Sequence, residues 1–291
     1  MASGVCQRPV GEITGVLTHP ARQSCSGLLA TDYGLRTTHQ PAMNRDPGDY
    51  VSATKHPWPC FLFLLPFLAA YEGGVLWLGG THPEALRNGA DTWLHWGLDS
   101  FGLHELYWGP ALIAVGFLAW SWWRRDDRPY DLIGVYLGMA VESVVFALGL
   151  WGLSRELSPF LEKFGGVLGP PNSSPPVNPA LVHIITFLGA GIYEEVLFRL
   201  LLFTGLVWLA RHLQIPQLIA IPVAAVGSGL LFAAAHHIGP YGEKFDGYVF
   251  LFRALAGVYF ALLFKIRGFG IAVGAHAIYD VLVGVIFNSG W

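Results

Sequence analysis

Two adjacent carboxylates and an arginine interrupt an otherwise apolar segment of the chain. Glu194, Glu195 and Arg199 occur in the sequence Tyr-Glu-Glu-Val-Leu-Phe-Arg, inside an apolar stretch that runs from residue 180 to 210. Charged groups in the hydrocarbon layer of a membrane cost about 3 kcal/mol or more each, so they persist where they face a protein interior, pair with one another or do chemistry. Residues four apart share one face of an α-helix, so Glu195 and Arg199 are expected to pair, while Glu194 is rotated away by about 100° and left free.

Two segments farther along the chain present polar groups at the same four-residue spacing. His236 shares a helix face with Phe232 in the sequence Phe-Ala-Ala-Ala-His-His. His276 shares one with Asp280 in His-Ala-Ile-Tyr-Asp. Glycine and alanine flank all three polar faces, and small residues let helix backbones approach closely in lipid. Converging helices would bring Glu194, His236 and His276 together around a water-filled cavity, where a carboxylate beside an imidazole is a competent general base for water.

The composition indicates the class of protein that must position these groups. Of the 291 residues, 53% are hydrophobic and only 13% are charged, whereas soluble domains carry about 25% charged residues. Apolar runs recur at the length of about 20 residues that a helix needs to cross a bilayer. The sequence therefore predicts an all-α, polytopic membrane helical bundle with about seven transmembrane helices. The predicted spans cover residues 58–78, 107–123, 132–153, 180–210, 217–235, 247–264 and 269–287.

Three regions of different character follow one another along the chain. Residues 1–55 are polar and lack a sustained apolar period, so we expect a disordered N-terminal arm. Residues 56–179 hold the first transmembrane helices. They also hold an expected interfacial segment at 79–106 and a proline-rich loop at 155–179 whose prolines disfavour helix. Residues 180–291 hold the three polar faces.

Other polar residues near the expected spans have simpler interpretations. Glu72 and Glu142 are expected to make structural polar contacts, although intramembrane carboxylates can also line a substrate or proton path. His237 and Arg253 are expected to be structural or interfacial. Phe232 is expected to pack.

Composition and spacing also bear on cofactors and partners. The net charge of -3 argues against a nucleic-acid partner, which would require a basic surface. The three cysteines show no Cys-x-x-Cys spacing and the chain contains no His-Glu-x-x-His sequence, so we predict no metal and no other cofactor. Zinc is the alternative, because two glutamates and two histidines can also ligate this ion.

The ordered set Glu-Glu-x-x-x-Arg, Phe-x-x-x-His and His-x-x-x-Asp on successive membrane helices resembles the CPBP family of CAAX proteases and bacteriocin-processing enzymes. The resemblance covers about residues 180–288. The family includes the Ras-converting type of CAAX endopeptidase, an intramembrane glutamic protease that removes three residues after a prenylated cysteine. The resemblance implies that residues 180–291 form a catalytic core in which Glu195 and Arg199 are an orienting pair.

The resemblance also implies catalytic roles. Glu194 would be the general base that activates water with help from His236, while His276 and Asp280 would line an oxyanion site. The last position departs from the asparagine of the prenyl-processing enzymes, and an ionised carboxylate cannot donate to an oxyanion as an amide does. Asp280 would instead orient His276 or stay protonated in its apolar setting.

The leading hypothesis is therefore an intramembrane endopeptidase. It would hydrolyse a peptide bond near the terminus of a membrane-associated, and in some family members prenylated, protein or peptide. The expected setting is a multi-pass protein of the lipid bilayer, in the cytoplasmic membrane of a prokaryote. Two alternatives remain open: a metal-dependent membrane hydrolase, and a non-catalytic membrane scaffold or bacteriocin immunity protein.

Overall fold

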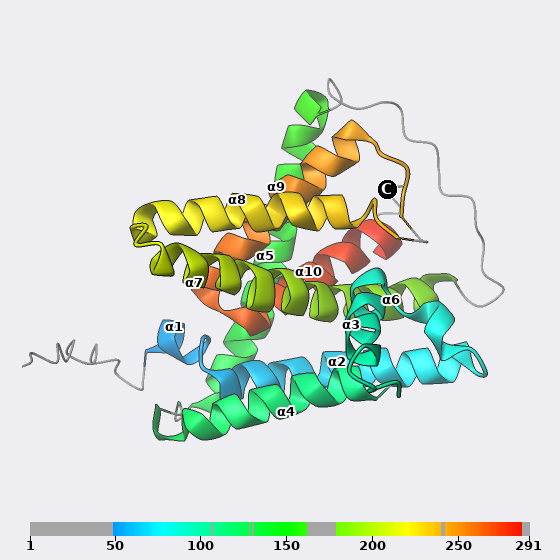
Figure 1. The fold of residues 1–291 in the computed structure, drawn as a ribbon, viewed down its shortest axis with the longest axis horizontal. Helices are drawn as coiled ribbons and strands as arrows, with labels where there is room; N and C mark the ends of the chain where they lie inside the picture. The colour runs from blue at the N-terminus through cyan, green and yellow to red at the C-terminus, as the bar shows by residue number, and fades with distance from the viewer. Residues whose placement is uncertain are drawn as a thin grey trace, which may run out of the picture. The chain divides into compact units, whose positions relative to one another are not determined.

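The computed structural model describes residues 49–105, 107–127, 129, 131–161, 179–239 and 242–286. The regular secondary structure of these residues is entirely helical, which confirms the predicted all-α class. The α-helices shown in Figure 1 are α1 (Tyr50–Ala53), α2 (Pro57–Gly79), α3 (Gly89–Asp99), α4 (Trp108–Trp123), α5 (Leu132–Leu161), α6 (Pro179–Glu195), α7 (Thr204–His212), α8 (Gln217–Ala235), α9 (Gly247–Arg267) and α10 (Phe269–Val281). Short 3₁₀ turns at Pro83–Leu86 and Arg125–Asp127 and π-helical segments at Val196–Phe203 and Leu282–Ile286 complete them.

Within the described residues, six helical segments are long and apolar enough to cross a membrane. These are Pro57–Gly79, Leu132–Phe160, Ala180–His212, Gln217–Ala235, Gly247–Arg267 and Phe269–Ile286. The remaining predicted span, at 107–123, is present as α4, but its 16 residues extend only about 24 Å, less than the roughly 30 Å of a hydrocarbon core. The predicted count of seven thus exceeds the six long helices by one.

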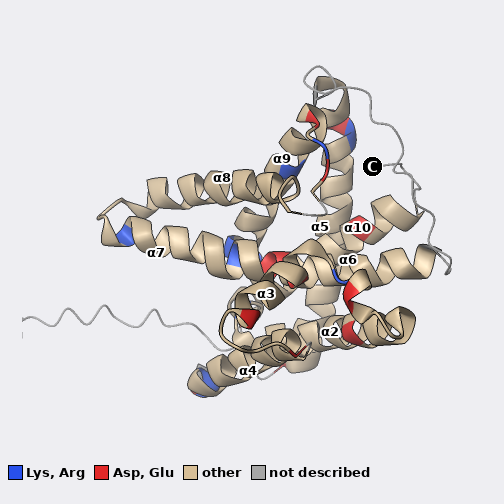
Figure 2. Ribbon diagram, turned by 45° about the vertical axis from the view of Figure 1, so that its right-hand side comes forward, with Lys and Arg blue, Asp and Glu red and all other residues tan. Residues whose placement is uncertain are grey.

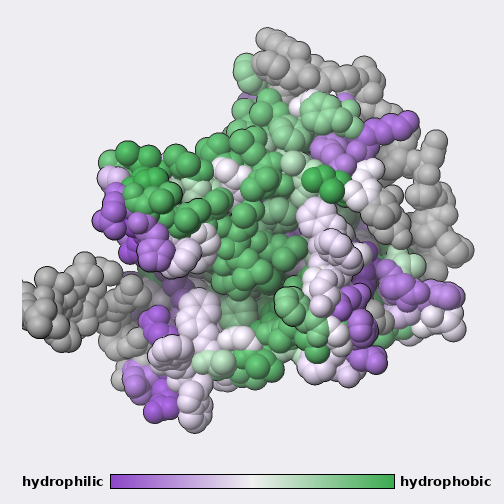
Figure 3. All heavy atoms as spheres, in the orientation of Figure 1, coloured by the Kyte–Doolittle hydropathy of each residue, from purple (hydrophilic) through white to green (hydrophobic). Residues whose placement is uncertain are grey.

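The outward faces of these helices are apolar, as expected for a protein that lies in lipid. Figure 3 shows hydrophobic residues over much of the visible surface. Leu218 on α8 is 87% exposed, and Val223 and Leu231 on the same helix are also exposed. Such a surface would be unfavourable in water and is favourable against acyl chains. The chain is an integral membrane protein.

Helix α10 occupies the centre of the bundle. It packs against α2, α5, α6 and α9, while α8 packs against α7 and α9 (Figure 1). Every residue of α10 from Phe269 to Ala277 is buried. The residues predicted to do chemistry on this helix therefore lie near the middle of the protein.

Glycines permit the close helix crossings that the sequence predicted. A Cβ atom at Gly191 on α6 would lie 2.8 Å from Ala277 Cβ and 2.9 Å from Ala277 N on α10. A Cβ atom at Gly257 on α9 would lie 2.6 Å from Gly229 Cα on α8. Only glycine fits at these contacts without movement of a backbone, because real Cβ atoms do not approach other atoms so closely.

The N-terminal boundaries differ in part from the prediction. Most of the expected disordered arm, residues 1–48, lies outside the described residues. Its final residues include helix α1, which Asp49 caps by accepting a hydrogen bond from Val51 N. Helix α5 runs to Leu161 rather than ending at residue 153, and the part of the proline-rich loop at 162–178 also lies outside the described residues.

The expected interfacial segment contains helix α3, which packs against α6 and α4. Asn88 caps this helix by accepting a hydrogen bond of 2.7 Å from Asp91 N. Ala90, Asp91 and His95 are buried. Acidic positions gather where α2, α3 and α6 meet (Figure 2). One side of the segment is thus part of the protein interior, rather than the whole segment lying at the membrane interface.

Candidate active site

The predicted ion pair between Glu195 and Arg199 is present. Arg199 Nη1 lies 3.1 Å from Glu195 Oε1, and both side chains are buried. The guanidinium carbon of Arg199 lies 4.6 Å from the centre of the Phe232 ring and 5.4 Å from that of Phe260. Arg199 is thus held by one carboxylate and two aromatic faces, which attract a desolvated cation.

Glu195 has a second partner that the four-residue spacing did not reveal. His276 Nδ1 on α10 lies 2.8 Å from Glu195 Oε1 on α6. An ionised carboxylate only accepts hydrogen bonds, so the contact assigns a proton to Nδ1 and directs Nε2 to the opposite side of the ring. The Phe260 ring stacks on the imidazole with 4.5 Å between centroids, which fixes the plane of His276.

Two more carboxylates lie near His276 Nε2. Glu194 Oε2 is 3.6 Å away and Asp280 Oδ2 is 3.5 Å away. The side chains of Glu194 and Asp280 are 14% and 22% exposed, whereas Glu195 is fully buried. Glu194 and Asp280 therefore line the open side of the site and Glu195 its inner side.

His236 is the residue immediately after α8. Its Nδ1 lies 2.9 Å from the carbonyl oxygen of Phe232, and because a carbonyl only accepts, Nδ1 carries the proton and Nε2 has a free lone pair. Burial lowers the pKa of His236 even though the charge of nearby Glu194 opposes this shift. A neutral imidazole with an available Nε2 can accept a proton.

The Phe232 ring joins the two halves of the site. Its centroid lies 4.9 Å from that of His236 and 6.1 Å from that of His276, with edge-on geometry in both cases. The expectation that Phe232 packs is therefore confirmed. The structure brings Glu194, His276 and Asp280 into one cluster and places His236 beside it across this aromatic ring.

The polar residues outside this cluster have the structural contacts expected of them. Glu142 pairs with Arg267 of α9, whose Nε donates to it at 2.7 Å. Arg253 pairs with Glu243 at 2.7 Å, and His237 Nδ1 lies 3.0 Å from the carbonyl oxygen of Glu243.

Glu72 belongs to a polar network that the sequence did not predict. Arg87 Nη2 donates to Glu72 Oε2 at 3.0 Å, and the hydroxyl of Tyr193 donates to Glu72 Oε1 at 2.6 Å. Tyr193 directly precedes Glu194 in the motif. Its contact with Glu72 could not be predicted, because no spacing rule links residues 121 positions apart.

The side chains gathered in this site are of types that ligate zinc, so their arrangement in the described part of the chain bears on the metal-dependent alternative. No group of three or more His, Cys, Asp or Glu side chains there is arranged to hold a metal ion. The absence of a cofactor stays a prediction that chelation can test.

The match to a known family falls on the same region as the site. Residues 176–282 match the family model described as Type II CAAX prenyl endopeptidase Rce1-like. No curated protein and no solved structure matches the chain. The matched range contains each of the three polar faces, from Glu194 to Asp280. The segment 176–282 of this integral membrane protein is thus similar to the CAAX protease family.

Proposed function

We propose that the protein is an intramembrane endopeptidase that uses a water molecule activated by Glu194 and His236. The observation that carries the proposal is the pairing of a partly exposed carboxylate, Glu194, with the Nε2 side of a buried, oriented imidazole, His276, inside a membrane bundle. A carboxylate and neighbouring imidazoles supply both a proton acceptor and hydrogen-bond donors for a hydrolytic reaction.

The reaction begins with removal of a proton from water. Glu194, assisted by the neutral Nε2 of His236, takes this proton while the water oxygen attacks the carbonyl carbon of the scissile peptide bond. A tetrahedral intermediate with a negatively charged oxygen results. The proton then passes to the leaving nitrogen, the C–N bond breaks, and a carboxylate and an amine are released.

His276 is the group suited to stabilise the oxyanion. Glu195 accepts from Nδ1, so a protonated His276 presents an Nε2–H donor on the open side, where Glu194 and Asp280 lie at 3.6 and 3.5 Å. In the proposal, Asp280 orients this donor or, when protonated, acts as a second one. Arg199 pairs with Glu195 and holds its carboxylate in place.

The family description, which names a prenyl endopeptidase, supports a proposal for the substrate class. We therefore assign to the site a membrane-associated peptide with a prenylated cysteine near its C-terminus. A lipid-modified peptide would reach a site within the bilayer by lateral diffusion, and the exposed apolar faces of the helices are compatible with such entry.

The direct test is cleavage of a farnesylated peptide by purified protein in lipid vesicles, followed by mass spectrometry. We expect release of the C-terminal residues by the wild type and at least a ~100-fold lower rate for Glu194→Gln. Glu156→Gln is the matched control, because Glu156 is an exposed carboxylate near the end of α5, and it should retain full activity.

Three results would contradict parts of this proposal. Full activity of Glu194→Gln would remove the glutamate from the mechanism. Loss of activity with a chelator, restored by zinc, would favour the metal-dependent alternative. Equal cleavage of a peptide without the prenyl group would show that the substrate class is wrong.

A further inference from the structure

The residue before the proposed general base is anchored to the N-terminal half of the protein. Tyr193 is fully buried, and its hydroxyl donates to Glu72 Oε1 of α2 at 2.6 Å. Its ring lies 5.5 Å from the ring of Tyr71. The side chain that directly precedes Glu194 is therefore fixed at both its ring and its hydroxyl.

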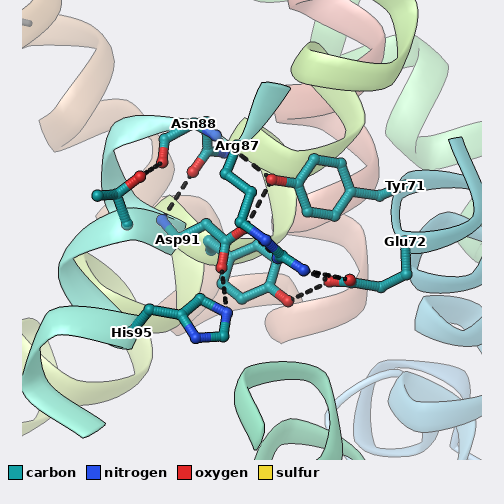
Figure 4. A network of polar contacts seen from close by, with 8 residues as sticks. Tyr71, Glu72, Arg87, Asn88, Asp91 and His95 are labelled. Carbon is teal, nitrogen blue, oxygen red and sulfur yellow. Dashed lines mark hydrogen bonds and ion pairs between the residues drawn. The ribbon is translucent and has the colours of Figure 1, made fainter. Parts of the chain in front are cut away.

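Glu72 is itself held in place by a buried arginine. Arg87 Nη2 donates to Glu72 Oε2 at 3.0 Å, and Arg87 Nη1 donates to Asp91 Oδ2 at 2.5 Å (Figure 4). The Arg87 side chain is only 3% exposed. Charge-assisted hydrogen bonds of this kind are stronger and more directional than neutral ones, so Glu72 has one preferred position.

Asp91 closes the network on α3. The hydroxyl of Tyr71 donates to Asp91 Oδ2 at 2.7 Å, and His95 Nε2 lies 3.2 Å from Asp91 Oδ1 (Figure 4). The ring of Tyr71 also packs against Gly189 of α6, where a Cβ atom would overlap it. Contacts thus run from α3 through α2 to two positions on α6, one turn apart.

The backbone after Glu194 makes such an anchor important. The α-helical hydrogen-bonding pattern ends at Glu195, and a π-helical segment begins at Val196. π-Helices are rare, occur mostly as short segments inside α-helices and are frequent at functional sites. The backbone hydrogen-bonding pattern therefore changes directly after Glu195. A side-chain contact next to Glu194 is needed to fix the rotation of α6 about its axis at this point.

We infer that Tyr193, Glu72 and Arg87 are positioning residues that fix the direction of Glu194 toward His276. Successive residues on a helix point about 100° apart, so the bond from Tyr193 to α2 determines where Glu194 points. The inference rests on the proposed function. It extends the groups that support the site to residues 71–95, which lie outside the family match at 176–282.

The test compares two tyrosine variants that each lose one hydroxyl. Tyr193→Phe retains the ring contact with Tyr71 but loses the bond to Glu72. We expect kcat to fall about 10-fold with KM within about twofold, because misplacement of a reacting group affects the chemical step rather than binding. Tyr259→Phe is the control, since that hydroxyl also joins two spans, donating to the carbonyl oxygen of Phe146 at 2.8 Å. An unchanged kcat for Tyr193→Phe, or an equal fall in both variants, would overturn the inference.

A graded series at Glu72 separates positioning from stability. Glu72→Gln keeps an oxygen that accepts from Tyr193, so it should retain several-fold more activity than Glu72→Ala. Glu142→Ala removes a comparable carboxylate from the pair with Arg267 and should lower thermal stability without lowering kcat. Equal loss in Glu72→Gln and Glu72→Ala would contradict the positioning role.

A second readout does not require catalysis. In a chain whose native cysteines are replaced by serine, Glu194→Cys is labelled with a small methanethiosulfonate, with and without Tyr193→Phe. We expect a several-fold change in labelling rate with Tyr193→Phe and none with Tyr259→Phe. Altered labelling, combined with a protein with native Glu194 that cleaves no farnesylated peptide, would uphold the positioning role and reject the proposed function. Unaltered labelling, combined with cleavage by the protein with native Glu194, would reject the positioning role alone.

Discussion

Glu195 uses one oxygen atom to hold two cationic or proton-bearing groups. Oε1 lies 3.1 Å from Arg199 Nη1 and 2.8 Å from His276 Nδ1. Both partners are buried with it, so neither can be replaced easily by water. Arg199 places a positive charge beside this oxygen, and His276 Nδ1 donates a hydrogen bond to it. Beyond its pairing with Arg199, Glu195 therefore sets the orientation of the site histidine.

Removal of Arg199 should destabilise the protein strongly. Arg199→Ala leaves Glu195 as a buried charge without its cation, and breaking a buried pair in this way costs about 3–5 kcal/mol. It also removes the group between the Phe232 and Phe260 rings. Thermal unfolding of the detergent-purified protein, monitored by size-exclusion chromatography, should show a large decrease in transition temperature.

Two companion variants make this prediction specific. Arg211→Ala removes an exposed arginine at the end of α7 and should change stability little. Arg199→Ala combined with Glu195→Gln removes both charges and should recover part of the lost stability. A single Arg199→Ala variant as stable as the wild type would show that the pair contributes nothing to the fold.

At the scale of single residues, the sequence predicts the pair within one helix and the meeting of Glu194 with His276, but it does not predict the contact between Glu195 and His276. Glu195 and Arg199 lie four apart on one chain segment, so helix geometry alone brings them together. The contact between Glu195 and His276 joins residues 81 positions apart. That distance depends on how α6 and α10 cross, which the spacing of polar residues does not encode.

At the scale of elements, the helix type changes within one polar face, between Glu195 and Arg199, and just after another, beyond Asp280. The segment Val196–Phe203 after Glu195 and the segment Leu282–Ile286 after Asp280 are π-helical. The amide of Thr204 donates to the carbonyl of Arg199, five residues earlier, which is the wider turn of a π-helix. The apolar pattern predicts a continuous helix here, because local composition does not distinguish π from α turns.

The crossing of α6 and α10 should be intolerant of added bulk. Gly191→Ala places a Cβ atom 2.9 Å from Ala277 N, so the two helices must separate close to Glu194 and His276. Activity should fall more than stability, because a small displacement of reacting groups affects rate strongly. Cleavage rate and transition temperature, measured on the same preparation, provide the comparison.

Gly205→Ala is the matched control for this crossing. Gly205 lies on α7, and nothing lies within 4 Å of a Cβ atom built there. This substitution should preserve activity and stabilise the helix slightly, since alanine has the higher helix propensity. Wild-type activity in Gly191→Ala would show that the site tolerates a wider crossing than the structure has.

At the scale of the whole bundle, contacts between helix ends indicate how often the chain crosses the membrane. His56 Nε2 at the start of α2 lies 2.8 Å from the carbonyl oxygen of Arg124 at the end of α4. A Cβ atom at Gly268, between α9 and α10, would lie 2.7 Å from Thr54 O. The start of α2, the end of α4 and the junction of α9 with α10 are therefore on one side. Because α2 leaves this side and α4 ends on it, this arrangement predicts that α4 returns the chain across the bilayer.

The apolar composition of the sequence predicted where α4 lies in the chain but not whether the helix is long enough to cross a bilayer. The apolar run at 107–123 predicted a span, and the structure has a helix of 16 residues there. A helix this short can still cross where its ends carry amphipathic side chains or where the bilayer thins. Trp108, Trp122 and Trp123 lie at its two ends, and tryptophan favours the headgroup region. The predicted crossing therefore depends on packing and anchoring as well as on helix length.

The crossing by α4 predicts which positions share a side of the membrane. Between Val51 and Arg211 the chain passes through α2, α4, α5 and the continuous segment Ala180–His212, so four crossings return it to the same side. Glu156, near the end of α5, should lie on the opposite side.

Single cysteines at these three positions, all exposed, would be labelled in intact and in permeabilised cells with a membrane-impermeant maleimide. Val51→Cys and Arg211→Cys should behave alike and Glu156→Cys oppositely. If Val51→Cys and Arg211→Cys are labelled from different sides of the membrane, α4 does not cross the bilayer. Only the crossings by α2, α5 and the segment Ala180–His212 would then separate the two positions.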